Sequence, residues 1–107
     1  MTELPLEVTV EEVRQNREGV ILIDVREPDE FILASIAGAE LVPMRTIPPR
    51  LMDFEDRPQP LVFFCHHGVR SLQVAAWLRD HGVENAQSMA GGIDAWSRLV
   101  DASVPRY

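Results

Sequence analysis

The chain has 107 residues, of which 46% are hydrophobic and 25% are charged, and its formal net charge is −7. This size and composition exclude a disordered chain, and we expect residues 1–107 to form one domain with a single core. The negative charge argues against non-specific binding to nucleic acid or to an anionic membrane surface. No apolar run approaches the roughly 20 residues that cross a bilayer. The first residues lack the basic and apolar stretches of a secretory signal, so we expect a cytoplasmic protein.

The first half of the chain alternates between helical and strand-like patterns. Thr9 followed three residues later by Glu12 matches a capping box at the start of a helix. Residues 20–24, VILID, form an unbroken apolar run that ends in an acid, which is typical of a buried parallel strand. Residues 27–34 predict a short helix with a proline in its first turn. Residues 40–42 predict a brief strand after a glycine turn.

The second half continues the alternation. Residues 46–54 predict a short helix with two prolines at its start. Residues 61–64, LVFF, are the second continuous apolar run and predict another buried strand. From Ser71 onward, apolar residues recur at close to helical spacing, and Gly82 is expected to end that helix. A strand near residues 84–89 and a final helix after a glycine pair complete the chain.

Strands that alternate with helices predict an α/β fold with a parallel sheet covered by helices on both faces. In such sheets, functional sites form beyond the carboxyl ends of the strands. Asp24 and Cys65 both occupy that edge. We therefore expect the functional site to lie there.

The chain's single cysteine, Cys65, stands between the apolar run and a short loop, in the stretch FFCHHGVRS. A free cysteine has a pKa near ~8.5, so only a few per cent of it is the reactive thiolate at neutral pH. Three features would stabilise that thiolate here. The helix that begins near Ser71 points its positive end at the loop, and the loop around Gly68 can turn backbone N–H groups inward as an anion-binding nest. Three cationic side chains also lie within five residues of the cysteine: His66, His67 and Arg70.

The spacing from Cys65 to Arg70 limits what the loop can hold. It is C-x4-R, a ring of six residues, whereas cysteine phosphatases use C-x5-R to surround a phosphoryl group. The smaller ring favours a smaller guest, a single sulfur atom added to the cysteine. One other interpretation is a cysteine buried only for packing. A zinc site with the two histidines is not expected, because adjacent side chains on a tight loop diverge and no further ligand pair accompanies them.

Four segments of the chain resemble the rhodanese family of sulfurtransferases in their order and spacing. The resemblance covers nearly all of the chain and implies an α/β domain with a small parallel sheet of about five strands, flanked by helices on both faces. The segments are LIDVREPDEF (22–31), IAGAELVP (36–43), FFCHHGVRS (63–71) and GGIDAW (91–96).

The resemblance also implies roles for the matching residues. Cys65 matches the nucleophile that takes sulfur from a donor as a persulfide and passes it to an acceptor, with no metal and no organic cofactor. Asp24 and Arg26 match a turn beside the loop, where they are expected to brace the loop or line its entrance. Glu30 and Ser71 are expected to support the site. The amides that match the persulfide-cradling loop are those of His66, His67, Gly68, Val69 and Arg70.

Two departures from the family pattern bear on the donor. Ser35 stands where many relatives have a histidine, so a role resting on that histidine is absent. Glu30 stands where the long two-domain enzymes that favour thiosulfate have a basic residue, and a carboxylate there would repel a dianion. We therefore expect a persulfide or a protein-bound sulfur to be the physiological donor.

Two interpretations are open for the Arg70 guanidinium, since both suit a bidentate group. It contacts the donor, or it pairs with an acid such as Glu30. The same choice applies to Arg26, for which three acids are considered: Glu27, Asp29 and Glu30.

The leading prediction is a sulfurtransferase that moves sulfane sulfur through a Cys65 persulfide. The donor would be thiosulfate or a persulfide, and the acceptor a thiol, cyanide or a sulfur-accepting protein. We expect a monomer or a weak dimer. Two alternatives stay open: a rhodanese-fold module that binds partners without catalysis, and a cysteine phosphatase or arsenate reductase, against which the six-residue ring argues.

Overall fold

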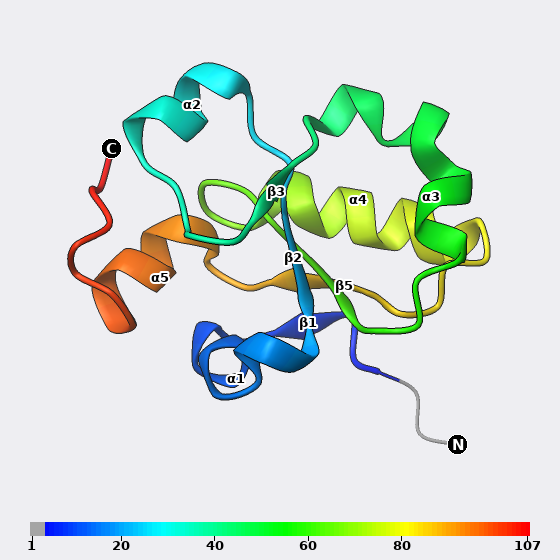
Figure 1. Cartoon of the computed structure of the whole chain (residues 1–107), viewed down its shortest axis with the longest axis horizontal. Coiled ribbons are helices and arrows are strands. Elements are labelled where there is room, and N and C mark those ends of the chain that lie inside the picture. Colours follow the sequence, from blue (N-terminus) through cyan, green and yellow to red (C-terminus); the bar gives the residue numbers. More distant parts are fainter. Residues whose placement is uncertain (1–3) are drawn as a thin grey trace.

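Five parallel strands form one sheet in the computed structural model, which describes residues 4–107. The strand order is β1-β5-β4-β2-β3, and each pairing is parallel (Figure 1). This confirms the predicted α/β fold class. Because β4 lies at the centre, its apolar run is covered on both faces. The strands are β1 (Glu7–Val8), β2 (Ile21–Asp24), β3 (Glu40–Leu41), β4 (Leu61–Phe64) and β5 (Ala86–Met89).

Helices connect the strands and cover the sheet. The capping box at the first of them is present, since Thr9 Oγ1 accepts from the Glu12 amide and the Glu12 carboxylate accepts from the Thr9 amide, each at 3.1 Å. The α-helices are α1 (Val10–Gln15), α2 (Pro28–Leu33), α3 (Leu51–Glu55), α4 (Val69–Asp80) and α5 (Gly92–Leu99). Short 3-10 helices span Arg17–Gly19, Met44–Thr46 and Pro48–Arg50.

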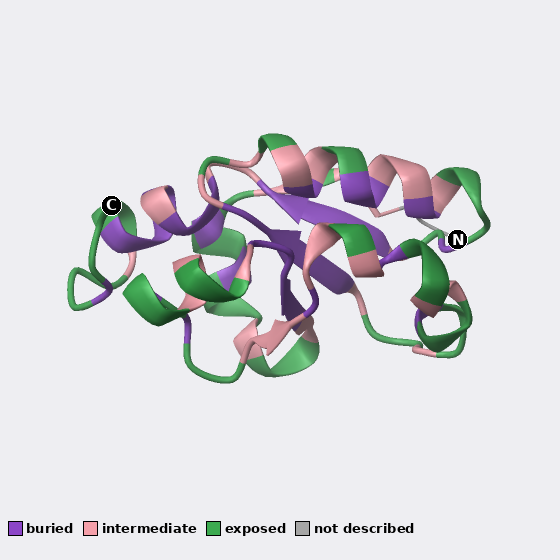
Figure 2. Ribbon diagram, turned by 90° about the horizontal axis from the view of Figure 1, so that it is seen from above, coloured by how far each residue is buried: buried purple, intermediate pink, exposed green. Residues whose placement is uncertain are grey.

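The alternation of side chains along β4 divides the core between the two faces of the sheet. Leu61 and Phe63 pack with α3 and α4, whereas Val62 and Phe64 pack with α1 and α5. All four side chains are fully buried, and each contributes roughly 1.5–3 kcal/mol through its removal from water. Figure 2 shows the buried strands between helices whose outer faces are exposed. This packing fixes the carboxyl end of β4, from which Cys65 follows.

The structure differs from the sequence-based expectation in three elements. No pattern predicts β1, because two residues are too few to show a period. The expected helix over residues 46–54 is instead two 3-10 helices followed by α3, because Pro48 and Pro49 cannot donate the hydrogen bonds of an α-helix. α4 begins at Val69 rather than Ser71, because Gly68 adopts a positive φ of 103° and serves as its N-cap.

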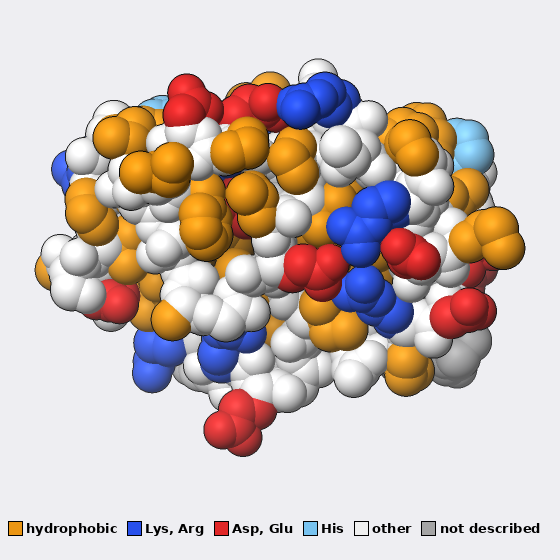
Figure 3. Space-filling model, turned by 45° about the horizontal axis from the view of Figure 1, so that its top comes forward, with side chains coloured by type: hydrophobic (Ala, Val, Ile, Leu, Met, Phe, Trp, Pro, Cys, Tyr) orange, Lys and Arg blue, Asp and Glu red, His pale blue; other side chains and the backbone are white. Residues whose placement is uncertain are grey.

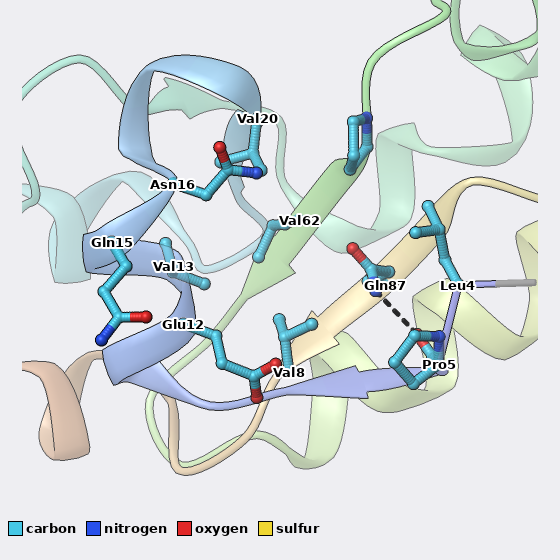
Figure 4. A pocket seen from close by; sticks show the side chains of 11 residues that line it. Leu4, Pro5, Val8, Glu12, Val13, Gln15, Asn16, Val20, Val62 and Gln87 are labelled. Carbon is cyan, nitrogen blue, oxygen red and sulfur yellow. Dashed lines mark hydrogen bonds between the residues drawn. The ribbon is translucent and has the colours of Figure 1, made fainter. Parts of the chain in front are cut away.

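A pocket of about 350 Å³ lies at the amino ends of the strands, between α1 and the sheet (Figure 4). Its floor is apolar, and the Gln87 amide at its side donates to the Pro5 carbonyl at 2.8 Å. The pocket is at the edge opposite to Cys65 and lies apart from the site described below. No helix within residues 4–107 is long and apolar enough to cross a membrane.

Candidate active site

Cys65 lies at the carboxyl end of β4, and its Sγ atom is enclosed by the loop that leads into α4. The Gly68 amide donates to Sγ at 3.1 Å and the Ser71 amide donates at 3.4 Å. The side chain is 1% exposed, so these main-chain dipoles act on the sulfur with little screening by water. The side chains of His67 and Val69 are exposed.

The beginning of α5 explains why the loop presents its amides to the sulfur. The carbonyl groups of Cys65 and His66 accept hydrogen bonds from the amides of Ile93 and Asp94, at 2.9 and 3.1 Å. These bonds turn the two carbonyl oxygens toward α5 and away from the thiol. The close approach requires glycine at position 92, because a Cβ atom there would lie 2.4 Å from the Cys65 oxygen and 2.5 Å from the His66 oxygen.

A pair of buried hydroxyl groups lies behind the sulfur. The thiol donates to Ser71 Oγ at 3.6 Å, and Ser71 Oγ lies 2.8 Å from Ser88 Oγ. Both serine side chains are completely buried. Ser71 Oγ also donates to the Gly68 carbonyl at 3.3 Å. If Ser88 donates to Ser71, the Ser71 O–H can turn from that carbonyl toward a Cys65 thiolate. Ser88 could not be singled out from the sequence, because its only signal is a small polar residue near the carboxyl end of a predicted strand.

Replacing Ser88 with alanine is expected to slow alkylation of Cys65 about three- to tenfold at neutral pH. The hydroxyl that orients Ser71 is lost, and a hydrogen bond to a charged group contributes roughly 1.5–3 kcal/mol when it is fully formed. Alkylation by iodoacetamide, followed from pH 5 to 10, measures the effect as a shift of the profile toward alkaline pH. Ser88→Thr retains a hydroxyl and should restore part of the rate. An unchanged profile in Ser88→Ala would show that Ser71 needs no such support.

Arg70 forms a two-point ion pair with Glu30 beside the loop. Nη1 and Nη2 donate to the two carboxylate oxygens at 2.8 and 3.0 Å, and the Tyr107 hydroxyl donates to Oε2 at 2.7 Å. The hydrogen bonds from Arg70, supported by that from Tyr107, lower the pKa of Glu30 to about 2 against the opposing effect of burial. Pairing with Glu30 raises the pKa of Arg70. Both groups are charged at neutral pH. Of the two interpretations given for Arg70, this geometry corresponds to the ion pair with Glu30.

Asp24 and Arg26 form a second two-point ion pair, and both side chains are completely buried. Arg26 Nε and Nη2 donate to the Asp24 carboxylate at 2.9 and 2.7 Å. The guanidinium also donates to the Ala34 carbonyl at 2.7 Å and to the Tyr107 hydroxyl at 2.8 Å. Because both side chains are completely buried, the pair does not line the entrance of the site. Pairing with one of three acids in or near α2 is one of the two interpretations left open for Arg26. The acid that it pairs with is instead Asp24, because the turn after β2 folds Arg26 back onto it, and only the main-chain carbonyl of Glu30 accepts from Arg26, at 3.3 Å.

His66 and His67 lie side by side, with ring centroids 3.9 Å apart, so the expectation that they diverge is wrong. The His66 ring also stacks on Tyr107 at 3.8 Å. Burial, with the neighbouring His67, lowers the pKa of His66. With Asp94, the histidines bring three potential metal-ligand atoms within 4.8 Å of one another. The Asp94 carboxylate is already held at 3.0 Å by two guanidinium groups, which would compete with a cation: those of Arg98 and Arg106.

Comparisons with known proteins identify the family and the fold. The rhodanese-like domain family matches residues 9–99. A thiosulfate sulfurtransferase, GlpE, from Pseudoalteromonas translucida is 31% identical over 91 residues, which are 85% of this chain and 86% of the relative. The rhodanese-like/PpiC domain-containing protein 12 of Arabidopsis thaliana is 34% identical over 94% of this chain, which spans only 37% of that protein. The crystal structure of a rhodanese-related protein from Thermoplasma volcanium has a TM-score of 0.81 and 26% identity, covering 90% of this chain and 94% of the other.

The fold and the site together define an α/β protein with a buried thiol that main-chain amides hold at the carboxyl edge of a parallel sheet. The chain belongs to the rhodanese-like family of sulfurtransferases. This confirms the resemblance drawn from the four sequence segments.

Proposed function

We propose that this protein moves sulfane sulfur by double displacement through a persulfide on Cys65. The observation that carries the proposal is the pair of amides, from Gly68 and Ser71, that donate to Sγ at 3.1 and 3.4 Å. Fixed dipoles aimed at a sulfur anion stabilise it without reorganisation. The proposed reaction is written with no metal and no organic cofactor. The remaining loop amides are proposed to surround the outer sulfur: those of His66, His67, Val69 and Arg70.

In the first step the Cys65 thiolate attacks the outer sulfur of the donor. An S–S bond forms to Cys65 as the donor's own bond to that sulfur breaks, and the electron pair leaves with the remnant, as sulfite from thiosulfate or a thiolate from a persulfide. In the second step an acceptor attacks the outer sulfur of the enzyme persulfide, and the Cys65 thiolate leaves. Cyanide would give thiocyanate, and a small thiol or a protein thiol would give a new persulfide.

We propose that the physiological donor is a persulfide, either free or protein-bound. Glu30 neutralises Arg70 at the loop, which removes the attraction that a dianion would need in a chain of net charge −7. On the face that Figure 3 shows, basic side chains at the top and on the right lie against acidic ones. Thiosulfate is then a poor surrogate donor for this chain. A thiosulfate KM far below about 1 mM with rapid turnover would contradict this assignment.

Replacing Cys65 with serine is expected to lower sulfur transfer at least about a thousandfold, because the hydroxyl is a far weaker nucleophile and cannot hold a sulfane sulfur. The measurement is thiocyanate formation from cyanide with a persulfide or thiosulfate as donor. Neither form should hydrolyse an aryl phosphate, because the six-residue ring is too small for a phosphoryl group. Wild-type transfer by the Cys65→Ser variant would contradict the proposal. A wild-type protein that transfers no sulfur but binds a partner would favour the non-catalytic module.

We further propose that residues 1–107 act as one cytoplasmic domain, as a monomer or a weak dimer. Its partners would be a small sulfur donor and a thiol, cyanide or sulfur-accepting protein. The single sheet with one buried layer on each face supports the domain assignment.

A further inference from the structure

Tyr107 contacts His66 of the cysteine loop and the partly exposed Arg70–Glu30 pair beside that loop, although it is far from the loop in sequence. This place, formed by Glu30, Arg70 and Tyr107, is called here the mouth of the proposed site. The tail after α5 brings Tyr107 beside α2 (Figure 1), and its ring stacks on His66 with 4° between the ring planes. Its hydroxyl accepts from Arg26 Nη1 at 2.8 Å and donates to Glu30 Oε2 at 2.7 Å. Tyr107 thereby connects the buried ion pair beneath the loop to the partly exposed ion pair beside it.

The side-chain charges along this chain of contacts alternate in sign and sum to zero. Asp24 is paired with Arg26, and Arg26 donates to the neutral Tyr107 hydroxyl. The Glu30 carboxylate in turn accepts hydrogen bonds from that hydroxyl and from Arg70. Burial raises the pKa of Tyr107 to about 12, so the hydroxyl keeps its proton and remains a donor at neutral pH.

The Tyr107 hydroxyl matters because of where it holds the Glu30 carboxylate. Glu30 and Arg70 are 18% and 34% exposed, so water competes for both groups. Oε1 accepts from Arg70 and from the Glu27 amide, and the Tyr107 hydroxyl is the second donor on Oε2 beside Arg70. This hydroxyl opposes rotation of the carboxylate away from the guanidinium. Without the hydroxyl, the pair would open more often and Arg70 would present an uncompensated positive charge to an approaching donor.

We propose that Tyr107 is a specificity-determining positioning residue, whose hydroxyl holds Glu30 on Arg70 and so keeps the mouth of the site electrically neutral. A neutral mouth selects sulfur donors of low negative charge over dianions. This inference rests on the proposed sulfurtransferase function. It assigns the choice of donor to a residue that does not touch the reacting sulfur.

The test compares two donors that differ in charge but deliver the same sulfur. Thiosulfate is a dianion and an arylthiosulfonate is a monoanion; in both, the Cys65 thiolate takes the outer sulfur, and sulfite or an arylsulfinate leaves with the electron pair. The quantity measured is the ratio of kcat/KM for the dianion to that for the monoanion. Tyr107→Phe keeps the ring on His66 and removes only the hydroxyl, whereas Glu30→Gln removes the neutralising charge itself. Glu40→Gln is the matched control, because Glu40 pairs with Arg50 and Arg57 on another part of the surface.

The ratio is expected to rise about three- to tenfold in Tyr107→Phe and further in Glu30→Gln, through a lower KM for the dianion, and to stay unchanged in Glu40→Gln. The thiosulfate KM should also become more sensitive to salt in the first two variants. Thermal unfolding of each variant is measured as well. A loss of stability alone would lower transfer from both donors and leave the ratio of their kcat/KM values unchanged. A ratio in Tyr107→Phe equal to wild type would overturn the assignment of Tyr107 even if Glu30→Gln shifts it. Transfer from neither donor in the wild type would overturn the proposed function itself.

Discussion

Replacing Gly92 with alanine is expected to lower sulfur transfer at least about a hundredfold and to destabilise the fold by roughly 2–4 kcal/mol. The added Cβ would lie 2.4–2.7 Å from backbone atoms of Cys65 and His66, which are not flexible side-chain ends and cannot move aside alone. The cysteine loop would have to shift away from α5. Its carbonyl groups would then lose the Ile93 and Asp94 amides, and its own amides would no longer converge on the sulfur. Sulfur transfer and chemical denaturation measure the two effects.

Gly82→Ala is the matched control for Gly92→Ala. Gly82 also has a positive φ, of 93°, but a Cβ there would meet no heavy atom within 4 Å. Its backbone strain alone should cost about 1–2 kcal/mol and leave transfer unchanged. If both variants keep full activity, the contact between α5 and the loop does not position the amides.

Replacing Asp24 with asparagine is expected to destabilise the protein by about 3–5 kcal/mol. The change keeps the size of the side chain and removes the charge that compensates the buried Arg26 guanidinium. Arg26 is 0% exposed and cannot reach water without opening the structure. The midpoint and slope of urea denaturation measure the change, and activity should fall with it because the pair braces the turn beside the loop.

An exposed ion pair supplies the control for Asp24→Asn. Glu11 and Arg14 are each half exposed on α1, so Glu11→Gln should change stability by no more than about 0.5 kcal/mol. If Asp24→Asn loses no more stability than Glu11→Gln, another group must compensate the charge of the Arg26 guanidinium. The buried pair would then not be a structural brace.

The sequence predicts those parts of the fold that have a local pattern. β2 and β4 are continuous apolar runs, and the structure places them next to each other at the centre of the sheet. The loop from Cys65 to Arg70 is also contiguous, so its cysteine, glycine and arginine could be recognised from spacing alone. In contrast, β1 has two residues and no period, and Pro48 and Pro49 divide a predicted helix into shorter turns.

The parts of the site that the sequence could not predict come from distant segments. Ser88 is 17 residues from Ser71, and Tyr107 is 77 residues from Glu30. Neither pairing has a signal in local composition, because each depends on how β5 and the tail pack against the loop. The partner of Arg26 could not be predicted for another reason. Several acids lie near Arg26 in the sequence, and only the conformation of the turn after β2 shows that Asp24 is the one that pairs with it.

The proposed reaction requires Cys65 to carry a sulfur that its surroundings stabilise, and intact-mass analysis tests this most directly. After incubation with a persulfide donor and removal of the excess, the wild-type chain should gain the mass of one sulfur atom and lose it again on treatment with cyanide. A wild-type chain that gains no sulfur, or a Cys65→Ser chain that gains the same mass, would contradict a persulfide on Cys65.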